Sequence, residues 1–488
     1  MDHDLAPGAR RSWWLREALR ADPGEPCPPL AGSTEADVVV VGGGYTGMWT
    51  SYFLARRAPG IRVVLLEADI LGGGPSGRNG GFVTGWWDEL PRLVDLFGEE
   101  AALRACRAVA ESVDAIGRWC LDHGVDAWYR KAGYLGVACS PAQEAGLAEA
   151  VELAARLGVG EELVALSAEE VRARCRSPVF RGGVLMRAAA TVQPARLARG
   201  LRRALLELGV RVHEGSPVVR FAAGGGGCTA ETPGGRVRAG QAVLALNAWA
   251  QGFPRLRRYL VTRGSYLVLT EPAPGLLEEL GWTGGECITD LRTSLHYFRT
   301  TPDGRIAFGG GGARTDAFGR VDRRFTHDRK AVRRTVEGFR RFFPAFASVR
   351  LVEAWGGPVD VSPTHLPFFG TFPGGRVHFG AGYSGNGVAP SHLGGQVLAS
   401  LVLGAEDELT RLPLVNRLPP PLPPEPLRSL GAALVNAAAI RKDRAEERGR
   451  RPGVLTRLAV GLPARLGYHL PTGRPRRPRL GPDPRVRM

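Results

Sequence analysis

The sequence predicts an α/β fold into which a second domain, an α+β unit with an antiparallel sheet, is inserted. A β-branched run over Asp37–Val41 leads into a glycine cluster, and a second apolar strand follows over Ile61–Glu67. Segments of the same α/β type return later in the chain, at residues 210–213, 241–249 and 377–380. Between the last two, residues 263–312 change to a strand-rich pattern with a hairpin turn at Pro302-Asp303-Gly304. One domain inserted into another is the simplest arrangement of this order.

The 488 residues are enough for two or three domains. We expect an N-terminal lead-in over residues 1–35. The α/β segments predict a discontinuous first domain made of three pieces, residues 36–90, 165–255 and 350–405. The inserted substrate domain then takes residues 91–164 and 256–349. A basic Pro- and Arg-rich extension occupies residues 406–488.

Apolar periodicity predicts helices outside the α/β repeats. Residues at three- and four-residue steps predict one helix over Glu99–Asp122 and another over Asp328–Phe343. In the C-terminal extension, Leu427–Glu447 is predicted to be a helical island. The aromatic and small residues of Asp126–Cys139 instead predict a hairpin.

The formal charge of +16 is concentrated near the C-terminus. From Arg411 onward there are 17 Lys and Arg against five Asp and Glu, so the rest of the chain is near neutral. Arginine suits phosphate, but the aromatic residues that stack on bases are nearly absent from this tail. We therefore do not expect nucleic-acid binding, whereas peripheral contact between the basic tail and a membrane is compatible with the composition.

Two further classes of protein are disfavoured. No apolar stretch approaches the roughly 20 residues that span a bilayer, and charges and prolines interrupt any N-terminal signal peptide. We therefore expect a cytoplasmic location. The seven cysteines are scattered and form no C-x-x-C motif, which argues against a disulfide scaffold or a zinc site. We expect reduced thiols and no metal.

The first strand runs directly into Gly42-Gly43-Gly44-Tyr45-Thr46-Gly47, a G-x-G-x-x-G motif. Gly42 permits a tight turn, Gly44 lets the backbone approach a pyrophosphate, and Gly47 lets the next helix pack on the strand. Phosphates sit well at such a helix N-terminus, where free N–H groups and the helix dipole favour negative charge. The second strand ends in Glu67-Ala68, about 20 residues after Gly47, and an acid there can accept hydrogen bonds from ribose hydroxyls. Strand, helix, strand and acid in this register predict a dinucleotide site.

Three further segments are typical of ligand contact. So many glycines in Ser76-Gly77-Arg78-Asn79-Gly80-Gly81 indicate a backbone held close to something flat or charged. Asn247-Ala248 ends a buried strand, where α/β proteins bind ligands. Gly382-Tyr383-Ser384-Gly385-Asn386-Gly387 opens a helix. Each segment has a structural alternative. The first can be a crossover loop with a solvated arginine, the second an ordinary turn asparagine, and the third a helix-entry loop whose glycines serve packing.

These segments, together with Tyr297-Phe298-Arg299 before the Pro-Asp-Gly turn, resemble the D-amino-acid oxidase family of FAD-dependent amine oxidoreductases. The resemblance covers about residues 36–405. Among the branches of the family, the Ser-Gly-Arg-Asn-Gly-Gly run is most similar to γ-glutamylputrescine oxidases, with aminophosphonate oxidoreductase-like members also related. The resemblance implies a Rossmann-like FAD-binding domain with an inserted antiparallel-sheet substrate domain.

The resemblance implies that the dinucleotide is FAD. Arg78 and Asn79 are then expected at the flavin ring or the pyrophosphate, with the neighbouring Ser76, Gly80 and Gly81. Val218 resembles the residue whose backbone meets adenine, the alternative being a core valine.

The same resemblance places the loop from Gly382 to Gly387 at the flavin pyrimidine edge, where the helix N-terminus stabilises negative charge on the reduced ring. Asn386 stands where relatives often have histidine. Gly357 fills the position of the cysteine that bonds to the flavin in monomeric sarcosine oxidases. We therefore expect non-covalent, dissociable FAD.

Substrate residues are expected on strands that face the flavin. Aromatic walls orient an amine, and an arginine can hold a carboxylate or phosphonate in a bidentate grip. The candidates on these strands are Tyr129, Tyr134, Tyr266, His296, Arg299 and Trp355, of which Tyr266, His296, Arg299 and Trp355 are the catalytic candidates. For each of them, a core or surface position is the alternative.

The reaction implied is oxidation of the C–N bond of a small amine or amino acid, with hydride passing to flavin N5 and the imine then hydrolysing. Some relatives activate oxygen with a lysine, but Gly309–Arg314 contains none. The electron acceptor is accordingly oxygen or another molecule. The alternative function is an FAD-dependent dehydrogenase of a 2-hydroxy acid or other non-amine substrate.

Overall fold

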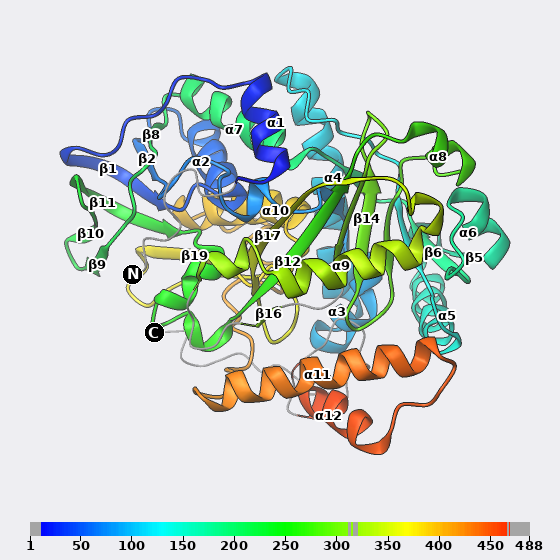
Figure 1. Ribbon diagram of the computed structural model, residues 1–488. Coiled ribbons are helices and arrows are strands. Elements are labelled where there is room, and N and C mark those ends of the chain that lie inside the picture. The colour runs from blue at the N-terminus through cyan, green and yellow to red at the C-terminus, as the bar shows by residue number, and fades with distance from the viewer. Residues whose placement is uncertain (1–10, 311–313, 316–320, 466–467, 469–488) are drawn as a thin grey trace.

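Two large sheets organise the protein, and the segments that form them are interleaved along the chain (Figure 1). The computed structural model describes residues 11–310, 314–315, 321–465 and 468. The first sheet lies beside α2, α7 and α10, and α9 crosses the second sheet in front. The predicted fold class, an α/β sheet with a second, mostly antiparallel sheet, is confirmed.

The first sheet has the strand order β18-β19-β11-β1-β2-β8. Five of these strands run parallel: β1 (Gly32–Val41), β2 (Val63–Leu66), β8 (Arg211–His213), β11 (Gly235–Leu244) and β19 (Val377–Ala381). The antiparallel strands at its margins are β18 (Phe368–Thr371), β9 (Arg220–Gly224) and β10 (Gly227–Thr232). Both faces are buried, which explains the continuous valines of β1.

Helices cover one face of this sheet: α2 (Tyr45–Arg57), α7 (Pro194–Glu207) and α10 (Val388–Val402). At their carboxyl ends, β1 leads into α2 and β19 leads into α10. Because the parallel strands share one direction, their following loops meet at one edge of the sheet, the usual ligand-binding edge of such folds.

The second sheet has the order β16-β12-β15-β14-β13-β4-β6-β5, with β17 also paired to β12. Its strands are β4 (Tyr134–Val137), β5 (Leu163–Leu166), β6 (Gly183–Met186), β12 (Val261–Thr270), β13 (Cys287–Asp290), β14 (His296–Thr300), β15 (Ile306–Gly310), β16 (Arg314–Thr315) and β17 (Leu351–Val361). One face packs on α9 (Arg329–Phe342) through a phenylalanine-rich core that includes Phe298, Phe308 and Phe339.

Membership of this sheet differs from the predicted domain boundaries. The strands β6 and β17 belong to the second sheet, although residues 165–255 and 350–405 were assigned to the first domain. Strand character is visible in a local pattern, but the partner of a strand is not. The predicted hairpin over Asp126–Cys139 is wrong for the same reason, because its strand β4 pairs with β6 and β13 instead.

The remaining elements surround the sheets. They are α1 (Trp13–Ala21), β3 (Phe82–Thr84), α3 (Leu90–Phe97), α4 (Glu99–Asp122), α5 (Pro141–Arg156), α6 (Ala168–Arg174), β7 (Ala189–Thr191), α8 (Pro274–Glu279), α11 (Leu427–Glu447) and α12 (Val454–Arg465). The predicted helices over Glu99–Asp122, Asp328–Phe343 and Leu427–Glu447 are confirmed.

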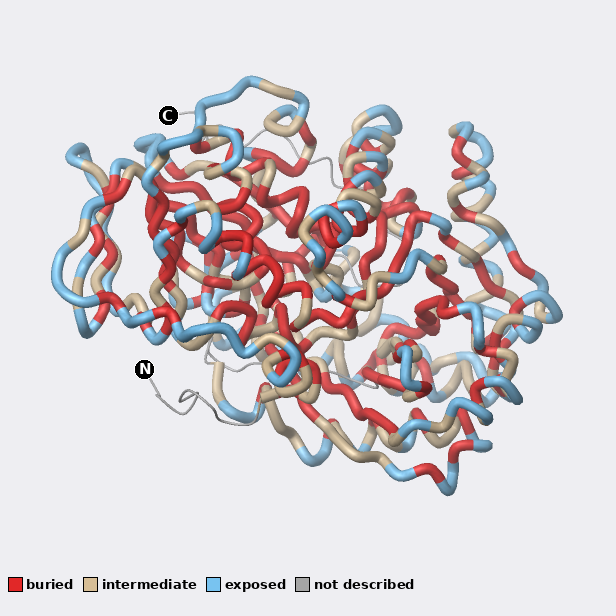
Figure 2. The backbone as a smooth tube through the Cα atoms, turned by 90° about the horizontal axis from the view of Figure 1, so that it is seen from above, coloured by how far each residue is buried: buried red, intermediate tan, exposed pale blue. Residues whose placement is uncertain are grey.

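Burial follows the two sheets, with the exposed residues on the outer helices and turns (Figure 2). The seven cysteines are all unpaired, and six of them are buried. Among the residues described, no helix combines the length and apolarity needed to cross a membrane.

Two core histidines make stability depend on pH. Burial lowers the pKa of His378 to about 4 and of His392 to about 3, so both stay neutral in the folded protein. The unfolded chain takes up their protons near pH 6.5, and stability is therefore lost as the pH falls below that value. We expect the free energy of unfolding to fall by about 2 kcal/mol per pH unit between pH 6 and 4 from this pair.

Chemical denaturation at several pH values measures that slope. His392→Gln keeps a partner for the Ser112 hydroxyl, which lies 3.0 Å from His392 Nδ1, but does not titrate. We expect the substitution to halve the contribution of the pair. A slope identical to that of the natural protein would contradict the assignment.

Candidate cofactor and substrate site

The glycine motif brings β1, α2 and β11 into backbone contact. Gly42 has φ +108°, and a Cβ atom there would lie 2.3 Å from the Ala245 carbonyl oxygen that follows β11. A Cβ atom on Gly47 would lie 1.9 Å from the Gly42 carbonyl oxygen. These two positions therefore exclude a side chain, and α2 begins directly against the end of β1. This is the close approach that the motif predicts.

Glu67 closes the turn beside the motif. Its carboxylate oxygens accept hydrogen bonds from the Gly43 N–H at 2.7 Å and the Asp69 N–H at 2.8 Å. Burial raises the pKa of Glu67 to about 7, against the effect of these two N–H groups. Each carboxylate oxygen can accept a second hydrogen bond, so the side chain keeps acceptor capacity for a ribose hydroxyl. Ala68 follows it on the surface.

Replacing Glu67 by glutamine should weaken FAD binding. An amide has one acceptor oxygen, so its NH2 group would face one of the two backbone N–H donors, at a cost of about 1–3 kcal/mol. We expect the Kd for FAD to rise about tenfold to a hundredfold, measured by fluorescence titration of the apoprotein. Glu35→Gln, an exposed position near the other end of β1, is the matched control. Equal affinities in both variants would remove Glu67 from the site.

The Ser76–Gly81 loop is held against the start of α2. The Ser76 hydroxyl accepts the Tyr45 N–H at 2.9 Å, and the Asn79 side chain bonds within its own loop, to Pro75 O, Ser76 O and Gly81 N. Arg78 is buried, not solvated, and its Nε donates to Gly73 O at 3.1 Å. Burial lowers the pKa of Arg78 to about 10, which leaves the guanidinium charged at neutral pH.

The loop before α10 lies beside the same edge. Its Thr46–Tyr383 contact joins it to α2, because the Thr46 hydroxyl donates to the Tyr383 hydroxyl at 2.7 Å. Asn386 Oδ1 accepts the Thr84 hydroxyl at 2.9 Å, which ties the loop to β3. Ser384 has φ +55° and its Oγ accepts the Ser362 N–H at 3.1 Å.

Asp360, which the sequence did not single out, connects two of the predicted segments. Its carboxylate is fully buried and accepts Asn247 Nδ2 at 2.9 Å and the Gly382 N–H at 2.5 Å. Burial raises its pKa to about 7. Asn247 in turn accepts the Ala248 N–H and has φ +45°.

These features fit a dinucleotide. The N-cap residues of α2 and α10, Gly44 and Gly387, make no side-chain capping hydrogen bond. At α2 the Ser76 hydroxyl takes the first N–H, that of Tyr45, and the dipoles of both helices favour an anion at their N-termini. Gly357 lies beside Arg78, since a Cβ atom there would be 3.4 Å from Arg78 Cβ, an ordinary contact. Val218 is partly buried against the core on the opposite face of the first sheet, two residues after Ser216, whose N–H donates to Glu67 O.

The second sheet presents alternate residues to this edge. Tyr297 lies in one row with Gly309, Leu267 and Trp355 by strand register, and this row faces the Ser76–Gly81 loop. Tyr266 and His296, two of the predicted catalytic residues, each neighbour a residue of this row along their strand, so their side chains lie on the other face of the sheet. They point to the α9 side, away from the loop.

Tyr266 and His296 have structural partners on that side. The Tyr266 hydroxyl donates to Arg324 O at 2.6 Å. His296 Nδ1 lies 2.9 Å from Asp290, and burial lowers the pKa of the histidine. Burial alone would raise the pKa of Asp290. The neighbouring Arg292 and His296 have the larger, opposite effect and lower this pKa to about 2. We therefore interpret both predicted residues as parts of the core.

Arg299 and Trp355 lie on the loop-facing side but are enclosed. Arg299 donates to Val192 O and lies over the Trp14 ring. Trp355 donates from Nε1 to Arg78 O at 2.8 Å and packs edge-on to Trp14 at 5.8 Å. Both are positioned to support the Ser76–Gly81 loop. The enclosing helix α1 lies in the predicted lead-in over residues 1–35.

Tyr297 and Ser265 are the side chains that the sequence missed on this face. Their hydroxyl oxygens are 2.7 Å apart, and neither residue is fully buried. The Tyr297 ring lies over Gly309 and against Gly80. A Cβ atom on Gly80 would lie 3.0 Å from the ring, and one on Gly309 would lie 2.3 Å from it. Phe82 meets its edge at 5.8 Å. An aromatic hydroxyl next to the glycine loop is suited to orienting a small substrate.

The two other tyrosine candidates lie apart. Tyr134 lies on the same face of the sheet as Tyr297 and is buried. Tyr129 donates to Val113 O at 2.9 Å and lines an open hollow of about 550 Å³ beside α4. The stretch Gly309–Arg314, considered for oxygen activation, falls partly outside the described residues.

Known proteins share the sequence pattern and the fold of this chain. The family model described as "FAD dependent oxidoreductase" (DAO) matches residues 37–401. The chain is 31% identical to a probable oxidoreductase OrdL of Rhizobium meliloti, over 79% of this chain and 87% of that protein. It is 30% identical to gamma-glutamylputrescine oxidoreductase of Escherichia coli, over 79% and 88%. The solved glycine oxidase of Geobacillus kaustophilus has a TM-score of 0.63 at 21% identity, over 78% of this chain and 98% of that one.

Proposed function

Since the chain belongs to the DAO family of FAD-dependent oxidoreductases, we propose that it oxidises the C–N bond of a small amine or amino acid with non-covalently bound FAD. Bound FAD supplies a hydride acceptor at flavin N5, and the imine product hydrolyses in water. Support for an amine comes from the relatives, whose names specify gamma-glutamylputrescine and glycine, both of which contain C–N bonds.

One observation carries the proposal. The N-termini of α2 and α10 lie at one sheet edge, joined by the 2.7 Å contact between Thr46 and Tyr383. The first suits the pyrophosphate, and the second suits a ring that gains negative charge on reduction. The loop-facing side of the second sheet, with Tyr297, lies opposite. Two electropositive helix ends facing an aromatic wall fit a flavin and a small substrate between them.

The side chains at this face position the substrate. Burial raises the pKa of Tyr297 to about 12, so the phenol remains neutral and is not a base at neutral pH. With Ser265 it supplies an aromatic wall and a hydroxyl pair. The proposal accordingly assigns no acid–base residue, and the substrate binds as the neutral amine.

Replacing Tyr297 by phenylalanine should separate substrate positioning from cofactor binding. Loss of the hydroxyl leaves Ser265 without this partner and is expected to lower kcat/KM for the amine about tenfold, or about 1.4 kcal/mol. FAD content should not change. Tyr259→Phe, a buried tyrosine in the core on the far side of the first sheet, is the control. Unchanged kcat/KM in Tyr297→Phe would remove this residue from the substrate site.

An anaerobic screen tests the function. The flavin-loaded protein is mixed with amines, amino acids and 2-hydroxy acids, and loss of flavin absorbance is recorded. We expect bleaching by an amine with hydrogen on its α-carbon, and a carbonyl product together with ammonia or a smaller amine. Bleaching by 2-hydroxy acids alone would overturn the proposal in favour of a hydroxy-acid dehydrogenase. Admitting oxygen afterwards separates rapid reoxidation from transfer to another acceptor.

A further inference from the structure

The C-terminal helix pair α11 and α12 carries most of the exposed large apolar side chains of the described chain. Seven of the twelve exposed large hydrophobic residues lie on these two helices, which pack on each other: Leu427, Leu430, Leu434, Val454, Leu455, Leu458 and Leu462. Leu430 is 65% exposed and Leu455 82%. The family match ends at residue 401, so this surface lies outside the shared fold. A concentrated apolar patch of this kind marks an interaction surface.

The same face of α11 changes from apolar to basic along its length. Leu427, Leu430 and Leu434 follow helical spacing, and the exposed Arg441, Arg444 and Arg448 continue it. These three arginines have no ion-pair partner among the residues that the structure describes. The turn into α12 adds the exposed Arg450 and Arg451.

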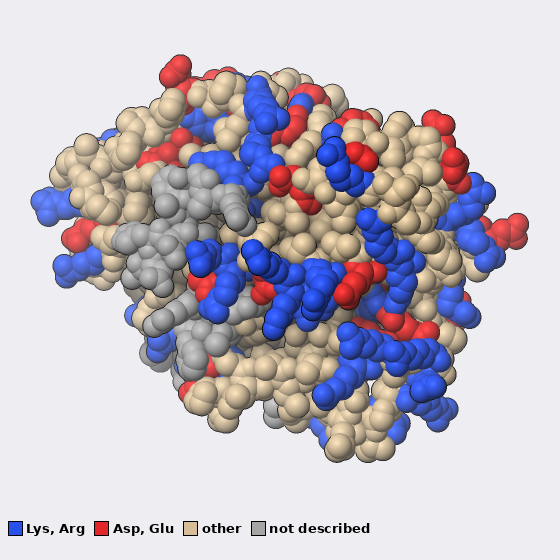
Figure 3. All heavy atoms as spheres, in the orientation of Figure 1, with Lys and Arg blue, Asp and Glu red and all other residues tan. Residues whose placement is uncertain are grey.

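The neighbouring surface has the same sign of charge. Figure 3 shows Lys and Arg side chains gathered over α9 and beside α11. The α9 sequence contains six Lys and Arg residues and one glutamate, Glu337. A partner with negative charge is therefore favoured over this whole face.

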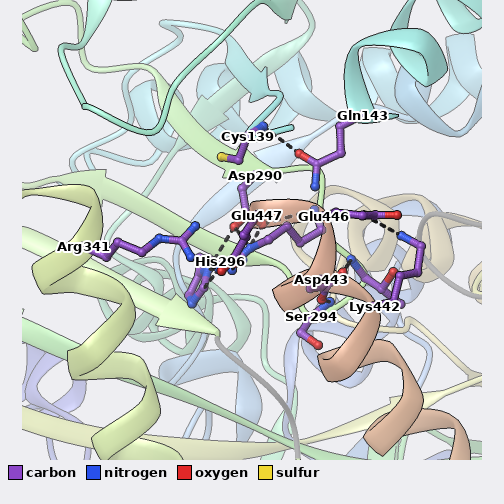
Figure 4. A network of polar contacts seen from close by, with 12 residues as sticks. Cys139, Gln143, Asp290, Ser294, His296, Arg341, Lys442, Asp443, Glu446 and Glu447 are labelled. Carbon is purple, nitrogen blue, oxygen red and sulfur yellow. Dashed lines mark hydrogen bonds and ion pairs between the residues drawn. The ribbon is translucent and has the colours of Figure 1, made fainter. Parts of the chain in front are cut away.

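Buried polar contacts fix α11 to the body, so its outer face is presented by an anchored helix (Figure 4). Asp443 accepts the Thr293 N–H at 3.1 Å and the Ser294 N–H at 2.7 Å. Glu447 forms ion pairs with Arg292 and Arg341. Asp443 and Glu447 are thus directed toward the body, while Glu446 pairs with Lys442 on the same helix and the three arginines are exposed.

We propose that the outer face of α11 and α12 docks on an anionic lipid surface. Leucine and valine beside arginine are the composition of helices that lie in a membrane interface. A second copy of this chain is disfavoured, because a self-association through this face would bring like charges together. Nucleic acid is disfavoured because neither helix contains an aromatic residue for base stacking.

Vesicle co-sedimentation of the full-length, flavin-loaded protein tests the proposal. We expect binding to phosphatidylcholine vesicles that contain phosphatidylglycerol, much weaker binding to phosphatidylcholine alone, and release by high salt. Leu455→Glu should lower the partition coefficient at least tenfold, as should the double variant Arg444→Glu/Arg448→Glu. Leu121→Glu on α4 is the matched control, because Leu121 is also 82% exposed.

Three results would overturn the proposal. The first is absence of binding to the anionic vesicles. The second is equal loss of binding in Leu121→Glu and Leu455→Glu. The third is a dimer in light scattering that Leu455→Glu dissociates, which would show that a second copy covers the face. Flavin absorbance and circular dichroism of each variant verify that the fold is retained.

Discussion

The Gly47→Ala protein is expected to lose FAD and much of its stability. The added Cβ atom would lie 1.9 Å from the Gly42 carbonyl oxygen and 3.3 Å from Val40 Cγ1. The oxygen belongs to the backbone of the turn itself, so relief requires α2 to move away from β1. Overpacking of this kind costs about 1–3 kcal/mol or more. It also displaces the helix N-terminus that is proposed to hold the pyrophosphate.

Flavin content after purification and the melting temperature measure the two effects. Gly146→Ala is the chemically identical control, because Gly146 lies in α5 with no atom within 4 Å of an added Cβ. It should retain FAD and be at least as stable as the natural protein. Normal FAD content in Gly47→Ala would contradict the close approach of α2 and β1.

Trp355→Ala should also lose FAD, through a different cause. Its indole is 2% exposed, supports Arg78 O by a hydrogen bond and fills the space next to Trp14. Removing a buried tryptophan costs about 3–5 kcal/mol. Because the cavity lies beneath the Ser76–Gly81 loop, we expect the Kd for FAD to rise at least tenfold. Trp355→Phe keeps much of the packing and should show the smaller effect of the lost hydrogen bond.

Trp282→Ala separates stability from cofactor binding. Trp282 is equally buried at 1% exposure, and its Nε1 also donates to a backbone oxygen, that of Glu286. It lies in the phenylalanine-rich core on the α9 side. We expect a similar loss of stability with unchanged FAD affinity. Equal FAD affinities in Trp355→Ala and Trp282→Ala would show that Trp355 has no part in holding the loop.

The cofactor edge could be predicted because its signals are local. The turn at Gly42, the helix start at Gly44 and the acid Glu67 all lie within one βαβ unit, whose geometry leaves few residue types for each position. The helices α9 and α11 were equally visible, since a 3.6-residue repeat needs no knowledge of the partner. The same is true of α4.

The substrate face could not be predicted because it depends on strand register. In β14, Tyr297 faces the glycine loop and His296 faces α9, and both faces are buried and rich in aromatic residues. The sequence of a strand shows that its side chains alternate between two faces. It does not show which of the two sets faces the cofactor. Asp360 was missed because its partners, Asn247 and Gly382, are brought to it only by the folded chain.

The central claim is that a dissociable FAD binds at the edge where α2 and α10 begin. Its most direct test is to precipitate the purified protein with acid and measure flavin in the supernatant and the pellet. The account predicts one FAD per chain, released into the supernatant. A folded protein that contains no flavin and takes up none, or flavin that stays with the pellet, would contradict it.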